Sequence, residues 1–374
     1  MNPAPPTVLE RVYIVTGEPS GDAHAAAVVR ALKVLNPGIA FRGMGGDAME
    51  AEGVALVEHV RNTAIMGFAE VVAKIRFIRQ LMRRVQDDVD QFSPDRILIV
   101  DYPGFNLRLA TWAKERGYAV DMYIAPQVWA WKRGRIHRMA RDLDRLYVIL
   151  PFEAAHYEGV DLKVDYVGHP LAEATEDEPH EAEAAWRRRC GLPADGALLA
   201  LLPGSRPQEI KRMLSGLVEA ARLLPEFVPV IAGAPGRSGE DYDTELPVLF
   251  GETAALYRWA SAGLITSGTA TLEAALQGLP QVVAYRTSGL TYRLARWFTE
   301  VRFISLVNLV LDREAVPERI QGECTPQALA DALRRVCAPD GREKLQQDLA
   351  ALRNALSKKG AAEAVAKGLS RRDP

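Results

Sequence analysis

The sequence predicts an α/β protein of two domains, each an open parallel sheet with helices on both faces. Short runs rich in Val, Ile and Leu alternate with longer segments of helical period. Each of these runs ends in a polar or Gly/Pro-rich loop. The chain has 374 residues, more than one ordinary domain needs. Because ligands of such sheets bind at the carboxyl ends of the strands, the loops after the strands are the places to look for function.

The first domain is predicted over residues 1–172 and the second over residues 173–341. In the first domain we expect helices such as 23–35 and 73–92, and strands at 12–16, 39–42, 96–100, 120–124 and 146–150. The second domain follows a charged stretch, with strands expected at 198–202, 228–232, 263–266 and 281–284. The helical segment of about residues 342–370 is a candidate to pack back on the first domain.

Composition excludes several classes of protein. Lys and Arg number 46 against 48 Asp and Glu, so no global basic field exists to hold nucleic acid. The 48% of hydrophobic and 25% of charged residues are typical of a soluble globular chain. The 3 cysteines are far apart, which predicts neither a disulfide framework nor a zinc site and fits a reducing cytoplasm. We find no secretory signal and no run of about 18 apolar residues, so we expect no membrane span.

The loop after the first predicted strand reads GEPSGD. Its glycines, Gly17 and Gly21, permit a tight turn, and Ser20 or Asp22 can cap the helix that follows. The exposed N–H groups of that helix attract anions or polar ligands, and Glu18 is then expected to face the crevice. Helix capping alone is the alternative interpretation of this loop.

The loop after the third predicted strand, DYPGFN, begins with Asp101. A carboxylate at the end of a buried parallel strand is poorly solvated, so its pKa should rise towards values useful for accepting a proton. Asp101 is therefore our first candidate for a catalytic base. Its alternative role is to cap the helix that begins near Pro103.

Aromatic and cationic residues follow the fourth predicted strand in the segment APQVWAWKRGR. Trp129 and Trp131, beside three cations, suit sugar faces and phosphates, although tryptophans also serve interior packing. Residues 65–85 form a segment with an apolar stripe bordered by Lys and Arg, which can lie on an anionic membrane. The pattern alone favours packing of this stripe on the protein's own sheet.

Two loops of the second domain are candidate phosphate sites. In LPGSR, Gly204 permits close backbone approach, Ser205 offers a hydroxyl and Arg206 a fork of donors. In SGTATLE, small hydroxyl residues open a helix, and Glu273 is placed to accept hydrogen bonds from a ribose diol. Capping is the alternative for each loop, but the two together indicate a site for a nucleoside diphosphate.

Other signals are less informative. The string GMGGDA resembles a dinucleotide-binding loop, but it follows the second strand, and no acidic residue lies about 20 positions later at a strand end. The DxD strings form no convincing metal site. His24 is expected to reach the crevice, and His169 to be a hinge or capping residue.

These loops, in this order, resemble lipid-A-disaccharide synthases, inverting glycosyltransferases of the GT-B type with two Rossmann-like domains facing a central cleft. The resemblance covers nearly the full chain and rests on GEPSGD, MGFAEV, DYPGFN, APQVWAW, LPGSR, SGTATLEAAL and VNL. It implies transfer of diacylated glucosamine from UDP-2,3-diacylglucosamine to the 6-hydroxyl of 2,3-diacylglucosamine 1-phosphate. The products are a β-1,6-linked disaccharide 1-phosphate and UDP, and no metal or redox cofactor is implied.

The resemblance also assigns roles to residues. Asp101 and Glu18 are its catalytic positions. Its substrate and UDP contacts are Ser20, Gly21, Asp22, Gln127, Trp129, Ser205, Arg206, Ser267, Gly268, Thr269, Glu273, Tyr285, Arg286 and Asn308. The amphipathic pattern alone favours core packing of this helix. The resemblance instead implies that the helix faces the membrane, through Val72, Ile75, Ile78, Leu81 and Met82. The partners it implies are the UDP-sugar donor, the acylated sugar-phosphate acceptor and the inner face of the cytoplasmic membrane, with a homodimer suggested.

The chain departs from the family pattern in two places. Well-known members carry a second carboxylate where this chain has Gly104, and the segment after residue 232 is too short for the helix usually found there. Two alternatives stay open at this point. One is a UDP-sugar epimerase of related architecture, and the other is a homologue that binds nucleotide sugars without turnover.

Overall fold

A computed structural model describes residues 9–64, 71–126, 134–173, 181–287 and 302–371. The chain forms two compact units. The first unit comprises Met1–Pro170 and Lys358–Pro374, and the second comprises Leu171–Ser357. The chain thus enters the second unit at residue 171, and its last segment belongs to the first unit. The predicted second domain ended at residue 341, whereas α15 (Pro339–Ala355) lies wholly in the second unit.

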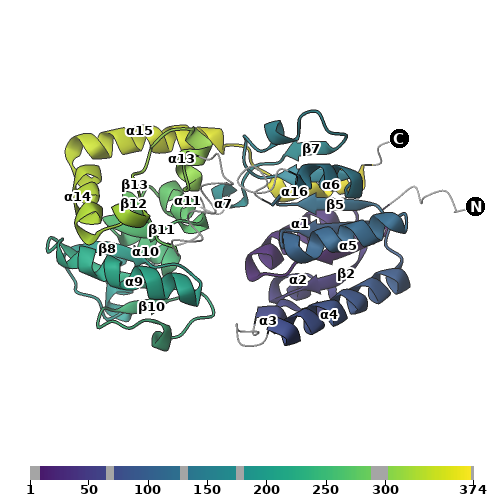
Figure 1. The fold of residues 1–374 in the computed structure, drawn as a ribbon, viewed down its shortest axis with the longest axis horizontal. Coiled ribbons are helices and arrows are strands. Elements are labelled where there is room, and N and C mark those ends of the chain that lie inside the picture. Colours follow the sequence, from purple (N-terminus) through teal and green to yellow (C-terminus); the bar gives the residue numbers. More distant parts are fainter. Residues whose placement is uncertain (1–8, 65–70, 127–133, 174–180, 288–301, 372–374) are drawn as a thin grey trace, which may run out of the picture. The chain divides into compact units, whose positions relative to one another are not determined.

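The first unit contains a parallel seven-stranded sheet in the order β3-β2-β1-β4-β5-β6-β7 (Figure 1). Its strands are β1 (Arg11–Val15), β2 (Ala40–Gly45), β3 (Ala55–His59), β4 (Arg96–Val100), β5 (Val120–Tyr123), β6 (Arg145–Val148) and β7 (Lys163–Tyr166). Alternate side chains of β1 enter two different cores. Tyr13 and Val15 lie in one core, and Val12 and Ile14 lie in the other. A strand buried on both faces is apolar along its whole length, which is why β1 and β4 were predictable from the sequence.

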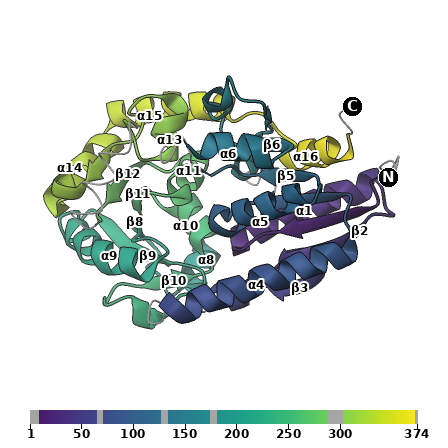
Figure 2. The same cartoon turned by 45° about the vertical axis from the view of Figure 1, so that its right-hand side comes forward.

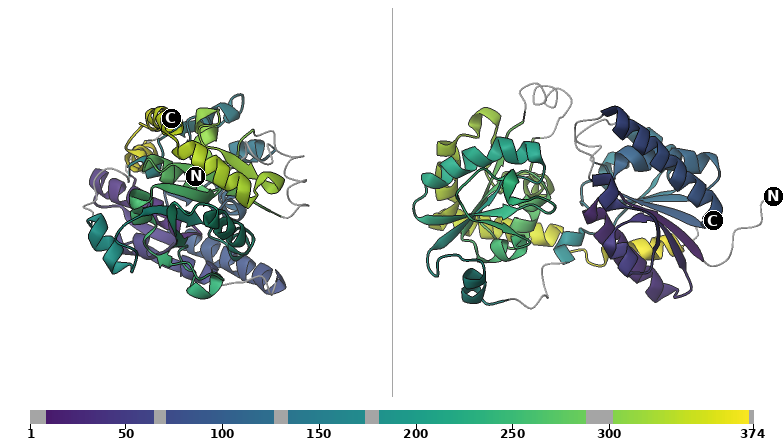
Figure 3. Two further views of the ribbon diagram at one scale, coloured as in Figure 1. Left: turned by 90° about the vertical axis from the view of Figure 1, so that its left-hand side faces the viewer. Right: turned by 90° about the horizontal axis from the view of Figure 1, so that it is seen from below.

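Helices cover both faces of this sheet (Figure 3). The α4 and α5 helices lie side by side over the core that contains Tyr13 (Figure 2). The α6 helix packs against α5 and covers the same core. On the opposite face α1 packs against α16, which the C-terminal segment supplies. The bounds are α1 (Pro19–Leu35), α2 (Asp47–Ala51), α3 (Val60–Ala64), α4 (Val71–Phe92), α5 (Pro103–Glu115), α6 (Arg135–Asp142), η1 (Ala154–Tyr157) and α16 (Ala361–Ser370).

The described apolar side chains of α4 pack on the core of the first unit. Leu81 is 1% exposed and belongs to the core of the first unit, and Ile78 and Met82 are partly buried against that core. The prediction that Leu81 faces a membrane is therefore wrong, because the sheet already covers this side chain. The side chains of Val72 and Ile75 lie outside the described residues.

The second unit contains a parallel six-stranded sheet in the order β10-β9-β8-β11-β12-β13. Its strands are β8 (Ala197–Leu202), β9 (Phe227–Gly233), β10 (Val248–Phe250), β11 (Ala262–Thr266), β12 (Gln281–Tyr285) and β13 (Glu318–Ile320). Between β9 and β10 the chain forms a single short 3-10 helix, η2 (Gly239–Asp241), in the segment that the sequence marked as short. The other helices are α7 (Pro170–Glu173), α8 (Glu183–Arg189), α9 (Pro207–Arg222), α10 (Thr253–Trp259), α11 (Thr269–Leu276), α13 (Leu306–Leu311), η3 (Gln321–Glu323), α14 (Pro326–Cys337) and α15.

None of the described helices combines the length and the apolar character that crossing a bilayer requires.

Candidate active site

In the first unit the strand order reverses between β1 and β4, which pair with each other. Open α/β sheets bind their ligands at such a reversal, beyond the carboxyl ends of the strands. The loop after β1 carries Glu18, and Asp101 directly follows β4. The sequence therefore places two carboxylates in adjacent loops at the position where this fold binds ligands.

Asp101 and Glu18 interact electrostatically. Burial is the main cause that raises the pKa of Asp101, and the negative charge of Glu18 raises it further, while a hydrogen bond from the backbone of Tyr102 opposes the rise. The direction is the one expected from the sequence. Glu18 itself is exposed. A half-buried carboxyl with a raised pKa beside an exposed carboxylate has the properties of a general base.

The backbone at Asp101 is strained. Asp101 and Tyr102 have φ values of 47° and 48°, in the left-handed region that side chains other than glycine rarely adopt. The Tyr102 ring packs directly on Gly17, where an added Cβ would lie 2.3 Å from it. Nothing in the sequence indicated this turn. The sequence also indicated no role for Asn106, whose side chain donates a hydrogen bond to the Asp101 carbonyl at 2.7 Å.

The other predicted residues of the GEPSGD loop have different surroundings. Ser20 is exposed at the start of α1 and available to a ligand. Gly21 is buried, and a Cβ at this position would lie 2.1 Å from the Thr16 Oγ1 atom, so close packing explains the glycine.

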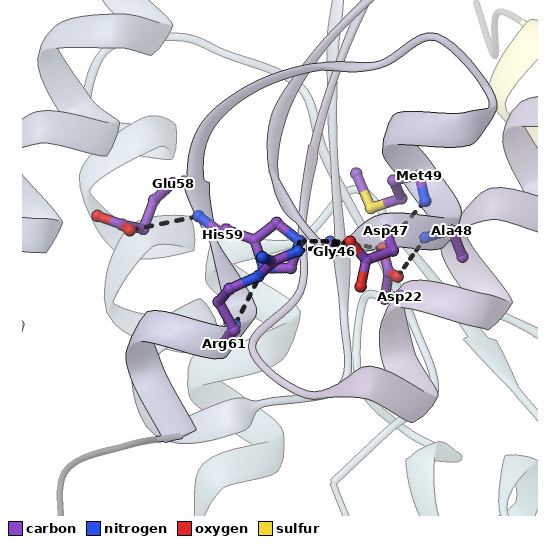
Figure 4. A network of polar contacts seen from close by, with 8 residues as sticks. All are labelled: Asp22, Gly46, Asp47, Ala48, Met49, Glu58, His59 and Arg61. Atoms are coloured by element: carbon purple, nitrogen blue, oxygen red, sulfur yellow. Dashed lines mark hydrogen bonds and ion pairs between the residues drawn. The ribbon is translucent and has the colours of Figure 1, made fainter. Parts of the chain in front are cut away.

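The Asp22 side chain is buried and bonded to backbone within the first unit, contrary to the prediction that it contacts a ligand. Its carboxylate is 5% exposed and accepts hydrogen bonds from the backbone N–H groups of Gly46 (2.6 Å), Ala48 (2.9 Å) and Met49 (3.2 Å) (Figure 4). The carboxylate caps α2 from a neighbouring helix, because the first N–H groups of a helix have no partner within it. Two of these hydrogen bonds use backbone N–H groups of the GMGGDA loop, the string that resembles a dinucleotide-binding loop.

A polar cluster next to this loop resembles a cation site. Ligand atoms of Asp47, Glu50 and His59 lie within 4.8 Å of one another. However, the Arg61 guanidinium lies 2.6 Å from Asp47 Oδ1 and donates from Nε to His59 Nδ1 at 3.0 Å (Figure 4). A cation is therefore already paired with these groups, so they are a poor site for a metal ion.

In the second unit the strand order reverses between β8 and β11. The loop after β8 carries Ser205 and Arg206, both exposed, with the Arg206 side chain 80% accessible. Glu209 Oε2 accepts hydrogen bonds from the backbone N–H groups of both residues at 3.3 Å. This carboxylate pre-forms the turn by accepting from both amides, and it also lies 3.6 Å from the Arg206 guanidinium. The Ser205 hydroxyl and the Arg206 guanidinium, which the sequence predicted to contact phosphate, lie on exposed side chains of this loop.

The adjacent loop after β11 opens α11. Gly268 and Thr269 are exposed, and an added Cβ at Gly268 would meet nothing within 4 Å. Ser267 donates from Oγ to the Ile304 carbonyl at 2.9 Å, so its hydroxyl has an orientation fixed by the protein. Burial raises the pKa of Glu273, one turn into the helix. The loop thus offers open backbone beside a poorly solvated carboxyl.

Of the remaining predicted contacts, Tyr285 is half-buried at the end of β12, and Arg286 is exposed and donates from Nε to the Gln321 carbonyl at 3.3 Å. Gln127 and Trp129 lie outside the described residues, so their role stays a prediction.

The Asn308 side chain is buried and bonded within the second unit, contrary to the prediction that it contacts a ligand. It is 0% exposed and donates to the Val316 carbonyl and to Glu318 Oε1, both at 2.8 Å. Its oxygen accepts from the backbone N–H groups of Ala315 and Val316. This amide uses its hydrogen-bonding capacity within the second unit.

Comparison with known proteins identifies the family of this chain. A family model described as lipid-A-disaccharide synthetase matches residues 12–368. The lipid-A-disaccharide synthase of Myxococcus xanthus is 40% identical over 371 residues, which cover 96% of each chain. That of Syntrophus aciditrophicus is 38% identical over 368 residues, which cover 95% of this chain and 96% of the relative. The chain belongs to the lipid-A-disaccharide synthase family.

Membership of this family makes the chain a glycosyltransferase of lipid A disaccharide synthesis. Solved structures of low identity agree in fold. The UDP-GlcNAc 2-epimerase of Neisseria meningitidis has a TM-score of 0.66 at 13% identity, covering 96% of this chain and 99% of its own. The calicheamicin glycosyltransferase CalG4 has a TM-score of 0.59 at 14% identity, covering 98% and 100%. The predicted GT-B type α/β architecture is confirmed.

The epimerase alternative is not favoured. The likeness to epimerases is limited to fold, whereas the sequence relatives and the family model are lipid-A-disaccharide synthases.

Proposed function

We propose that the first unit of this synthase binds the acceptor and supplies the base, while the second unit binds the UDP-sugar donor. The donor is UDP-2,3-diacylglucosamine and the acceptor is 2,3-diacylglucosamine 1-phosphate. The observation that carries this proposal is the pair of carboxyl groups Glu18 and Asp101 in adjacent loops at the strand-order reversal, with the pKa of Asp101 raised by burial and by Glu18.

The chemistry is a single displacement. Asp101 accepts the proton of the acceptor 6-hydroxyl as that oxygen attacks the anomeric carbon of the donor. The new glycosidic bond forms while the bond from that carbon to the pyrophosphate breaks, and its electron pair leaves with UDP. One displacement inverts the anomeric configuration and gives the β-1,6-linked disaccharide 1-phosphate. Gly104 carries no carboxylate, so one aspartate of the DYPGFN loop performs the proton transfer.

The leaving group interacts with the loops after β8 and β11. Arg206 is exposed and cationic, and the backbone at Gly268 and Thr269 opens α11 towards an anion. These groups stabilise the negative charge that develops on UDP in the transition state. Glu273 lies one turn into the same helix and accepts hydrogen bonds from the ribose diol.

The substrate class implies a location. Both substrates carry acyl chains, so the enzyme works as a peripheral protein on the inner, cytoplasmic face of the cytoplasmic membrane. Leu81 is buried in the core of the first unit and is therefore not a lipid contact, whereas Arg76, Arg79 and Arg83 of the same helix are exposed. Exposed arginines attract anionic headgroups. Assembly as a homodimer stays a prediction.

Incubation of the full chain with UDP-diacylglucosamine and diacylglucosamine 1-phosphate tests this function. Mass analysis should find a tetraacyl disaccharide 1-phosphate and one UDP for each disaccharide. Donor alone is the control, in which neither the disaccharide nor an epimerised sugar should form. Epimerised sugar without acceptor, or UDP binding without any product, would contradict the proposal.

A further inference from the structure

Asn106, in the first turn of α5, lies between the ends of two strands. Its side chain is 0% exposed, and its Nδ2 atom donates to the carbonyl oxygens of Val15 (3.3 Å), Val100 (3.2 Å) and Asp101 (2.7 Å). Val15 is the last residue of β1 and Val100 the last residue of β4. One amide group therefore ties together the two strand ends from which the Glu18 loop and the Asp101 loop begin.

The orientation of this amide shows which of its atoms matters. Asn106 Oδ1 is buried and has no hydrogen-bond partner among the described residues. The reverse orientation would place Oδ1 against three carbonyl oxygens, which repel it. A buried acceptor without a partner costs about 1–3 kcal/mol. A leucine of similar size would avoid this cost, so packing alone does not account for an asparagine here.

The shortest of the three bonds lies at a strained place. It goes to the carbonyl of Asp101, whose φ of 47° is followed by a φ of 48° at Tyr102. Backbone in this region persists only where the surroundings hold it. Asn106 holds it from the α5 side, and the Asp101 N–H, which donates to the Tyr123 carbonyl at 3.0 Å, holds it from the β5 side.

We propose that Asn106 is a positioning residue that fixes the Glu18 loop relative to the Asp101 loop, and so sets the interaction between the two carboxylates. Asn106 itself touches no substrate. This inference rests on the proposed role of Asp101 as the base, and its test separates the two claims.

The groups that surround Asp101 come from three elements. Glu18, in the loop after β1, contributes a negative charge, and Tyr102, in the loop after β4, contributes a backbone hydrogen bond. Tyr123 of β5 contacts the Asp101 backbone through its carbonyl oxygen. Of these, Glu18 acts through its charge, so a change in the spacing of the two loops acts on Asp101 mainly through Glu18.

The test is the pH dependence of kcat in Asn106→Leu. Without the clamp the two loops separate, the repulsion by Glu18 weakens, and the pKa of Asp101 falls towards its ordinary value. The acidic limb of the profile should therefore move to lower pH, and kcat should fall by about 10- to 100-fold because the base is misplaced. KM for the UDP-sugar should not change. In a Glu18→Gln background, Asn106→Leu should cause no further movement of the limb.

Two further variants keep the test decisive. Leu109→Ala removes a fully buried side chain of the same helix without touching the clamp, so it should lower stability and leave the acidic limb in place. Asn106→Ser keeps a donor that is too short to reach both strands, and should move the limb in the same direction as Asn106→Leu. The proposal is overturned if Asn106→Leu behaves like Leu109→Ala, or if its shift persists in the Glu18→Gln background.

A readout without turnover separates this inference from the proposed function. The pKa of Asp101, followed by NMR of selectively labelled carboxyl carbons, should fall in Asn106→Leu and not in Leu109→Ala. If this pKa falls in Asn106→Leu but Asp101→Asn keeps full turnover, the positioning role of Asn106 stands and Asp101 is rejected as the base. An unchanged pKa would reject the positioning even where Asp101→Asn is inactive.

Discussion

At the scale of single residues, burial acts in opposite directions on the acids and bases of the first unit. It raises the pKa of Asp101, where the neighbouring Glu18 adds to the effect. It lowers the pKa of His169, which burial and, to a smaller extent, the nearby His24 bring to about 4. Both shifts have the same cause, since a poorly hydrated group avoids its charged form. Asp101 thereby gains basicity, and His169 stays neutral in the folded protein at neutral pH.

His169 predicts a loss of stability in acid. Its pKa is lower in the folded chain than in the unfolded one, so its contribution is fully present above about pH 6.5 and is lost as the pH falls towards 4. The free energy of unfolding should fall by about 2 kcal/mol from this group between pH 7.5 and pH 5. In urea unfolding at both pH values, His169→Gln should show a smaller loss than wild type. His137→Gln, at an exposed histidine, is the matched control. Equal losses in wild type and His169→Gln would contradict the account.

Asp22 and Asn308 show where prediction from the sequence stops at this scale. Their positions in or near functional loops were predictable, but their partners were not. Asp22 bonds to N–H groups 24 to 27 residues away, and Asn308 to groups 7 to 10 residues away. A loop motif shows that a polar group is present, but only the fold shows whether backbone or ligand satisfies it.

At the scale of elements, the sequence predicted the inner strands and missed the edges. The strands without a prediction are β3, β7, β10 and β13, and each of them forms an edge of its sheet. Inner parallel strands are covered on both faces and are read as continuous apolar runs, such as RILIV in β4. An edge strand such as KVDY in β7 is short and half polar, because solvent reaches it.

The α4 helix allows core packing and membrane contact to be tested separately. Leu81→Ala should lower the free energy of unfolding by about 2–5 kcal/mol, because Leu81 lies in the core of the first unit. It should leave binding to anionic vesicles unchanged under conditions where the protein is folded. Arg79→Gln combined with Arg83→Gln should weaken binding to anionic vesicles and leave the free energy of unfolding nearly unchanged, since both side chains are exposed. Vesicle flotation and urea unfolding of the three proteins measure both effects. Loss of vesicle binding in Leu81→Ala alone would contradict the assignment of Leu81 to the core.

At the scale of the whole molecule, the proposed function divides the reaction between the two units. Each sheet reverses its strand order once, between β1 and β4 in the first unit and between β8 and β11 in the second. The carboxylates follow the first reversal, and the exposed Arg206 and the open start of α11 follow the second. One unit thus carries groups suited to accept a proton, and the other carries groups suited to hold a departing anion.

This division is tested most directly by comparing Asp101→Asn with Arg206→Ala, measuring kcat and the Kd for UDP in both. Asp101→Asn should lower kcat by about 10² to 10⁴, the usual contribution of a general base, and leave the Kd for UDP at its wild-type value. Arg206→Ala should weaken UDP binding and slow turnover together, because its charge acts in both the ground state and the transition state. Wild-type turnover in Asp101→Asn, or a loss of UDP affinity as large as that of Arg206→Ala, would contradict the account.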